Sequence, residues 1–135
     1  MREVLMGAGA RKVVETCARL RPGERLLIVT DFERVAIARV LAAAGHAAGA
    51  ETMVAAMEPR PIDNAEPPAA VAAAMKAADV VLLPVSKAIA HSAATKEALA
   101  AGARVLSMTA FTEEQLIGGG IEADFEKEKP RCDRV

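Results

Sequence analysis

Short apolar runs alternate with helical patterns along this chain, and the alternation restricts the fold more than any other feature of the sequence. Each run is rich in Val, Ile, Leu or Met, as buried strands are, and the stretches between them repeat apolar residues at helical spacing. The expected strands are RLLIVTD at 25–31, AGAETMVAAM at 48–57, DVVLLPV at 79–85 and ARVLSM at 103–108.

Strands that alternate with helices of about a dozen residues predict βαβ units and a parallel sheet. Because crossover connections are right-handed, we expect a doubly wound α/β domain with a mostly parallel sheet of four strands. The expected strand order is 2-1-3-4, with helices on both faces, as in Rossmann- and flavodoxin-like folds. One domain is expected over residues 1–125, and the charged residues 126–135 are interpreted as a tail or the start of a truncated linker helix.

Local signals predict where the helices begin and end. Thr30 with Glu33 forms a capping-box pattern before the second helix. Ser92 is a candidate cap for the fourth helix, which is expected to end at Gly102, and Thr112 is a candidate cap for a last short helix. A first amphipathic helix is predicted by the i, i+3, i+4, i+7 spacing of Ala10, Val13, Val14 and Cys17.

The composition excludes several classes of function. The formal net charge is −1, and the chain has 3 Phe but no Trp or Tyr, so neither charge nor base stacking favours nucleic acid binding. The longest apolar stretch is far shorter than the roughly 18 residues that a membrane span needs, and the N-terminus lacks a signal-peptide pattern. These features predict a cytoplasmic protein that binds neither membranes nor nucleic acids.

Known catalytic and metal-binding motifs are not found in the sequence. GAGARK at 7–12 is not preceded by a strand, so it is no dinucleotide fingerprint, and no phosphate-binding P-loop, H-E-x-x-H or G-x-S-x-G pattern occurs. Cys17 and Cys132 have no metal or redox spacing, and Cys17 is expected to be a buried structural thiol. The motifs therefore predict no metal site in this chain alone.

A ligand site is expected where the strand order reverses. In open α/β sheets ligands bind beyond the carboxyl ends of the strands at that point, which here lies between the first and third strands. The polar residues after those strands are candidates for ligand binding, and His91 is a candidate catalytic residue because its loop is the one polar loop with a titratable base at the expected crevice. The ligand-binding candidates are Asp31, Ser86, Lys87 and Thr95.

Simpler roles also fit these residues. Thr30 and Asp31 are good helix-capping residues, and capping alone would account for them. Lys87 suits a solvated surface unless an anionic partner is present, and His91 suits an ordinary surface loop. The residues alone do not assemble a catalytic centre.

Three stretches give the chain a resemblance to a known enzyme family. RPGERLLIVTD, AEPPAAVAAAMKAADVVLLPVSKAIAHSAATKEALAAGARVLSM and TEEQLIGGGIEADFE resemble the first domain of the thermophilic metallo-aminopeptidases, which include aminopeptidase T-like leucyl aminopeptidases. Ring-cleaving dihydroxypyridine dioxygenases are related to the same family. The likeness covers roughly residues 9–125, and its more specific part is the segment from the Pro-Pro pair at 67–68 to Val105.

The resemblance implies a divided enzyme. Members of the family are much longer, and their divalent metal is held by a second domain, so no metal ligand is carried over to this sequence. The loop from Ser86 to Thr95 corresponds to a family loop with a histidine at the position of His91. The resemblance implies that this loop faces substrate, with His91 donating a hydrogen bond or relaying a proton and Lys87 meeting a carboxylate.

Two kinds of function follow. The chain is either the substrate-side half of a metal-dependent aminopeptidase-like hydrolase or dioxygenase, inactive alone, or a stand-alone domain that binds a small ligand or a partner. The first requires a missing catalytic domain or chain and a small-molecule or peptide substrate. A homodimer is also expected, because a sheet of four strands leaves edges that need covering.

Overall fold

The computed structural model describes residue 7 and residues 9–63, 65–87, 89 and 92–108. His91, Cys132, the expected helix after Thr112 and the boundary between residues 125 and 126 lie outside these ranges. No helix within the described ranges combines the length and the hydrophobicity that crossing a bilayer demands.

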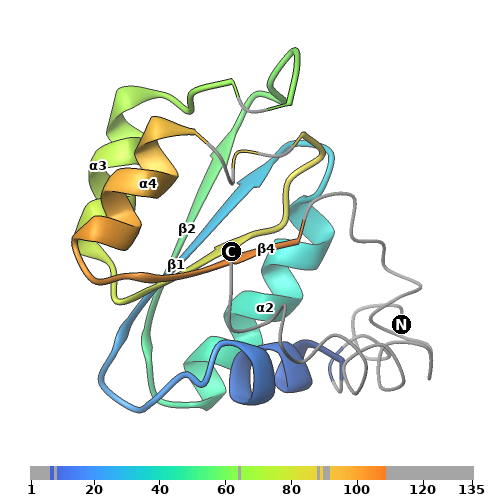
Figure 1. The fold of residues 1–135 in the computed structure, drawn as a ribbon. Helices are drawn as coiled ribbons and strands as arrows, with labels where there is room; N and C mark the ends of the chain where they lie inside the picture. Colours follow the sequence, from blue (N-terminus) through green and yellow to red (C-terminus); the bar gives the residue numbers. More distant parts are fainter. Residues whose placement is uncertain (1–6, 8, 64, 88, 90–91, 109–135) are drawn as a thin grey trace.

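The described residues form an α/β domain around one parallel sheet (Figure 1). Its strands are β1 (Arg25–Asp31), β2 (Glu51–Met57), β3 (Val80–Leu83) and β4 (Arg104–Ser107). The strand order is β2-β1-β3-β4, and each neighbouring pair is parallel. The predicted fold class and strand order are therefore confirmed, and the reversal of order lies between β1 and β3.

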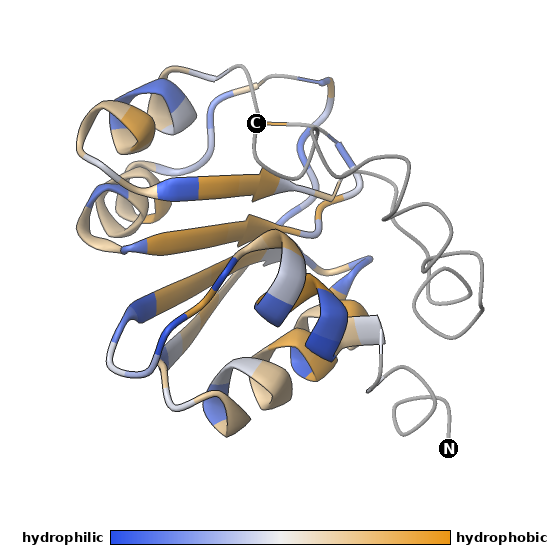
Figure 2. Ribbon diagram, turned by 60° about the horizontal axis from the view of Figure 1, so that its bottom comes forward, coloured by the Kyte–Doolittle hydropathy of each residue, from blue (hydrophilic) through white to orange (hydrophobic). Residues whose placement is uncertain are grey.

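Helices cover both faces of this sheet. The π-helical turn η1 (Val13–Cys17) and α2 (Val35–Ala47) lie on one face, and α3 (Ala69–Ala77) and α4 (Ala93–Ala100) lie on the other (Figure 1). Figure 2 shows that the strands between them are the most hydrophobic part of the chain. The predicted first helix is confirmed as a buried element, and its Cys17 is buried.

Side-chain alternation along β1 assigns residues to the two halves of the core. Leu26 and Ile28 are buried with η1 and α2, whereas Leu27 and Val29 are buried with α3 and α4. Successive residues of a strand point to opposite faces, so a strand with helices on both sides has to be apolar at every position. This explains the continuous apolar runs Leu26–Val29 in β1 and Val80–Leu83 in β3.

The predicted capping box before α2 is wrong. The helix begins at Val35, its N-cap Arg34 makes no side-chain capping bond, and Thr30 and Asp31 still belong to β1. Thr30 donates its hydroxyl proton to the carbonyl of Pro84 at 2.9 Å instead. Thr30 and Asp31 stay in the strand because they pair with Ala56 and Met57 of β2. A capping box would have required the strand to end before Thr30.

Both predicted ends of α4 are confirmed. Ser92 caps α4 by accepting a hydrogen bond from the Thr95 amide at 3.3 Å. Beyond α4, Gly102 has a φ of 101°, a left-handed conformation that glycine adopts without strain.

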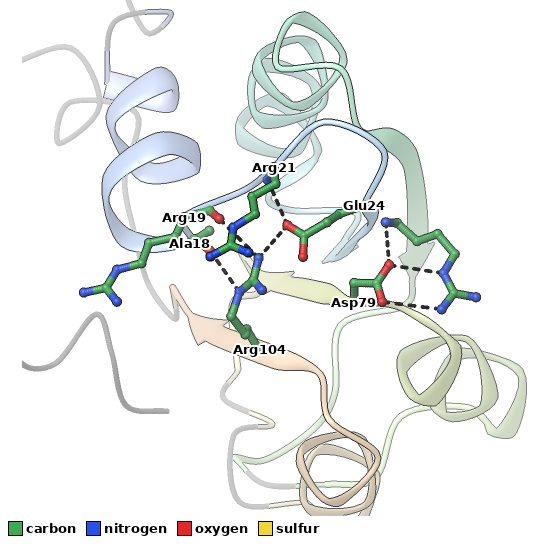
Figure 3. Close-up of polar contacts among 7 residues, drawn as sticks. Ala18, Arg19, Arg21, Glu24, Asp79 and Arg104 are labelled. Carbon is green, nitrogen blue, oxygen red and sulfur yellow. Dashed lines mark hydrogen bonds and ion pairs between the residues drawn. The ribbon is translucent and has the colours of Figure 1, made fainter.

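The amino ends of three strands are joined by ion pairs (Figure 3). Arg104 of β4 binds the carboxylate of Glu24 at 2.6 Å and donates to the carbonyls of Ala18 and Arg19, each at 3.2 Å. Arg25 of β1 donates its amide and its guanidinium to Asp79, which precedes β3, at 2.8 and 3.2 Å. These contacts lie at the opposite end of the strands from the predicted ligand site.

The same ion pairs perturb two acids. The hydrogen bond from Arg104 lowers the pKa of Glu24, and the hydrogen bonds from Arg25 lower the pKa of Asp79. Both carboxylates therefore bind protons more weakly in the folded chain than in the unfolded chain. Their stabilisation is present above the unfolded-state pKa of about 4 and is lost as the pH falls through the lower folded-state values.

We predict that the double variant Glu24→Gln, Asp79→Asn loses less stability on acidification than the unmodified chain. Urea unfolding at several pH values from about 5 down to 2 measures the difference. Glu97→Gln is the control, since Glu97 is an exposed residue of α4 outside these ion pairs. An equal loss of stability in the double variant and the unmodified chain would contradict the assignment.

Candidate functional site

The carboxyl ends of β1 and β3 are joined by the carboxylate of Asp31. Its Oδ2 accepts hydrogen bonds from the amide of Ser86 at 2.8 Å and from the hydroxyl of Ser86 at 2.6 Å. Its Oδ1 accepts a hydrogen bond from the amide of Glu33 at 3.0 Å. The structure therefore brings together Asp31 and Ser86, two of the predicted site residues, at the reversal of strand order.

A tight turn after β3 places Ser86 beside β1. The amide of Val85 donates to the carbonyl of Leu83 at 3.0 Å, and Thr30 holds the carbonyl of Pro84. Pro84 has no amide proton, so it cannot extend the ladder with β1 in the ordinary way. The chain turns there, and the next polar residue meets the Asp31 carboxylate.

Burial separates the roles of the two residues. Asp31 is 1% exposed, and both of its oxygens already accept hydrogen bonds within the chain. Ser86 is half-buried, and its hydroxyl proton is directed to Asp31, so its oxygen can still accept a hydrogen bond as far as the described residues are concerned. Asp31 can thus orient Ser86, and Ser86 can accept a hydrogen bond from an amino or hydroxyl group of a ligand.

The remaining predicted residues differ in exposure. Lys87 is exposed directly after Ser86, where its ammonium group can meet an anion at the surface of the site. Thr95 is 0% exposed, and its hydroxyl donates to the carbonyl of Ile89 at 2.7 Å, so this residue orders the start of α4. His91 lies outside the described residues, and its catalytic role stays a prediction.

Sequence reasoning missed two polar residues near these loops. The carboxylate of Glu66 accepts hydrogen bonds from the amides of Ala93 and Ala94, at 2.7 and 3.1 Å, and so caps α4 from the loop before α3. No local pattern could have revealed this cap, because its partners are 27 and 28 residues away. The Nε atom of Arg34 is buried without a hydrogen-bond partner among the described residues, and a ligand oxygen would satisfy it.

A metal site is not found in this part of the chain. The described residues contain no group of three or more His, Cys, Asp or Glu side chains able to hold a metal ion. The divalent metal that the family resemblance implies therefore does not fit these residues.

A separate groove of about 540 Å³ lies between the first helical segment and α2. Its described lining combines alanines of α2 with charged residues, and it contains none of the predicted ligand-binding residues. The lining is Gly7, Arg11, Glu15, Arg39, Val40, Ala43, Ala44, Ala47 and Ala48.

Comparison with solved structures identifies two enzymes with a similar fold. The 2,5-dihydroxypyridine dioxygenase from Pseudomonas putida KT2440 matches 79% of this chain with a TM-score of 0.66 and 14% sequence identity. Wild-type AmpT from Thermus thermophilus matches 87% of this chain with a TM-score of 0.51 and 15% identity. At these identities the likeness shows the fold alone.

Both similar proteins are much longer than this chain. This chain covers 34% of the dioxygenase and 41% of AmpT. No protein-family model matches the sequence, and no curated protein matches it. The fold of this chain therefore corresponds to a part of two longer proteins.

We predict that Asp31→Ala destabilises the domain by about 2–4 kcal/mol, because the amides of Ser86 and Glu33 lose their buried charged acceptor. Ser86→Ala should cost less, about 1 kcal/mol, since the other bonds to the carboxylate remain. Urea unfolding measures both effects, with Lys87→Ala as the exposed control at about 0.5 kcal/mol or less. An Asp31→Ala variant as stable as the control would show that this carboxylate does not hold the two strand ends together.

Proposed function

We propose that this domain is the substrate-side domain of a metal-dependent, aminopeptidase-like hydrolase whose metal ligands lie outside the described residues. The observation that carries the proposal is the fold match, in which most of this chain corresponds to 41% of AmpT and 34% of the dioxygenase. The stretches of sequence that resemble the metallo-aminopeptidase family, above all the segment from the Pro-Pro pair to Val105, favour the hydrolase.

The proposed substrate contacts lie at the carboxyl ends of β1 and β3. Ser86, held by Asp31, accepts a hydrogen bond from the substrate's amino group, and Lys87 pairs with a substrate carboxylate. His91, as the family resemblance implies, donates a hydrogen bond or relays a proton. The substrate is a small molecule or peptide that carries both an amine and a carboxylate.

A ring-cleaving dioxygenase-like enzyme is the second candidate, and one observation favours it. The TM-score to the dioxygenase, 0.66, exceeds the value of 0.51 for AmpT. The two candidates share the division of labour between a substrate-side domain and a metal-holding part, and they differ in the substrate that the domain should bind.

We expect this chain alone to release no leucine from leucinamide, even with zinc, manganese or cobalt added. The metal ligands that hydrolysis requires are proposed to lie outside this domain. Leucine release is measured by chromatography, with a metal-dependent aminopeptidase as the positive control. Metal-dependent release by the purified chain, abolished by a chelator, would refute the proposed division of the enzyme.

We expect the domain to bind leucine more tightly than leucinamide, because Lys87 meets the carboxylate that the amide lacks. Lys87→Ala should weaken leucine binding and leave leucinamide binding unchanged, whereas Ser86→Ala should weaken both. Chemical-shift titration of the isotope-labelled protein measures each affinity. Lys96→Ala is the matched control, since Lys96 is an exposed lysine of α4.

Three other results would change the proposal. Binding of dihydroxypyridine in place of leucine would favour the dioxygenase-like enzyme. Equal affinities for leucine and leucinamide would remove Lys87 from the site. Binding of neither kind of compound would refute the substrate-side role.

A further inference from the structure

Within the described part of the chain, β2 is an outer strand of the sheet and pairs with β1 alone. All seven of its residues pair with β1 in one unbroken register, from Arg25↔Glu51 to Asp31↔Met57, so no bulge bends the strand away. From Thr52 to Met57 the strand has no charged residue and no proline. Natural sheets block open edges with such features, and an edge without them is a template for another strand.

Exposed apolar side chains gather around the same edge. Met53 and Val54 are 41% and 47% exposed, and as successive residues they point to opposite faces of the sheet. Phe32, 62% exposed, follows β1 and donates its amide to the carbonyl of Met57 at 3.2 Å. Ile62, 66% exposed, lies in the loop after β2. The edge and its surroundings thus offer an apolar surface along with backbone groups that no described strand pairs with.

The backbone of β2 identifies which groups are open. The amide of Glu51 donates to Glu24 at 2.8 Å and the carbonyl of Met57 accepts from Phe32, so both of these residues bond toward β1. In a parallel pair, alternate residues turn both backbone groups to the same neighbour. Thr52, Val54 and Ala56 therefore direct their amides and carbonyls to the open edge.

We propose that two copies of this chain pair through β2, antiparallel, about a two-fold axis at Val54. This register sets Val54 opposite its symmetry mate and Thr52 opposite Ala56 of the second copy, so every outward amide and carbonyl finds a partner. Met53 then lies across from Ala55, a large side chain against a small one. Glu51 lies across from Met57, so no like charges meet.

A second copy fits this edge better in this register than in neighbouring ones. An axis at Met53 would pair Ala56 with Ala50, whose amide already donates to the carbonyl of Gly45 at 3.2 Å. An axis at Ala55 would set Thr52 against Glu58 and bring a charge into the apolar strip. The Val54 axis uses only open groups, and it joins two sheets into one continuous sheet. The inference is independent of the proposed enzymatic role.

Sedimentation equilibrium of the full chain tests the proposal with paired variants. Val54→Pro removes an amide proton that faces the open edge, so β1–β2 pairing and the circular dichroism spectrum should be retained. The dimer should weaken by about tenfold or more, because the symmetric pair loses two backbone hydrogen bonds. Val54→Lys, which sets two ammonium groups against each other, should also give monomers, whereas Leu99→Lys on α4 should leave the dimer intact.

Disulfide trapping tests the register. In a Cys132→Ser background, Val54→Cys should form an intermolecular disulfide under mild oxidation, because the two Cα atoms at the axis of a hydrogen-bonded pair lie about 5.5 Å apart. Thr52→Cys alone should not cross-link, because it faces Ala56 of the second copy. A monomeric unmodified chain, a dimer unaffected by Val54→Pro and Val54→Lys, or equal cross-linking at both positions would each overturn the proposal.

Discussion

Strands β1 and β3 bury side chains on both of their faces, and the rest of the domain follows from that requirement. Leu26 and Ile28 need α2 and η1 on one side, while Leu27 and Val29 need α3 and α4 on the other. Right-handed crossovers can meet both needs only if the chain reverses direction across the sheet after β2. The reversal creates the point at which the carboxyl ends of β1 and β3 lie side by side.

Polar residues at that point serve stability first. Asp31 is buried, and its hydrogen bonds to Ser86 and Glu33 close the two loops over the end of the sheet. A buried carboxylate is retained only when such partners satisfy it. The Asp31 carboxylate affects function indirectly, because it orients the hydroxyl of Ser86. The exposed Lys87 follows Ser86 directly in the chain. The candidate site thus combines a buried acid, Asp31, with the half-buried Ser86 and the exposed Lys87.

The sequence was sufficient for the fold because its signals are either local or periodic. The apolar runs predicted all four strands, crossover handedness predicted their order, and Ser92 with Gly102 predicted the two ends of α4. The capping box at Thr30 failed because its hydroxyl binds the carbonyl of Pro84, 54 residues away. Local patterns carry no information about a partner at that distance.

The candidate site could be predicted in place but not in detail. Strand order located Asp31 and Ser86 at one edge, yet the sequence could not show that both oxygens of Asp31 are occupied or that Thr95 is buried. The Glu66 cap on α4 was missed because its partners come from a different part of the chain. The exposure of Met53 and Val54 could not be predicted from the sequence either, since an edge strand and a central strand can have similar apolar sequences.

The strand order also sets the sequence of events during synthesis. β1, α2 and β2 are consecutive, and β1 and β2 share an unbroken register, so this unit is complete once residue 57 has left the ribosome. The partner on the other side of β1 begins only at Val80. One side of β1 therefore has no strand to pair with while the intervening segment is translated at about 5–20 residues per second. A nascent chain of this kind offers chaperones a hydrophobic target that the finished domain has entirely enclosed.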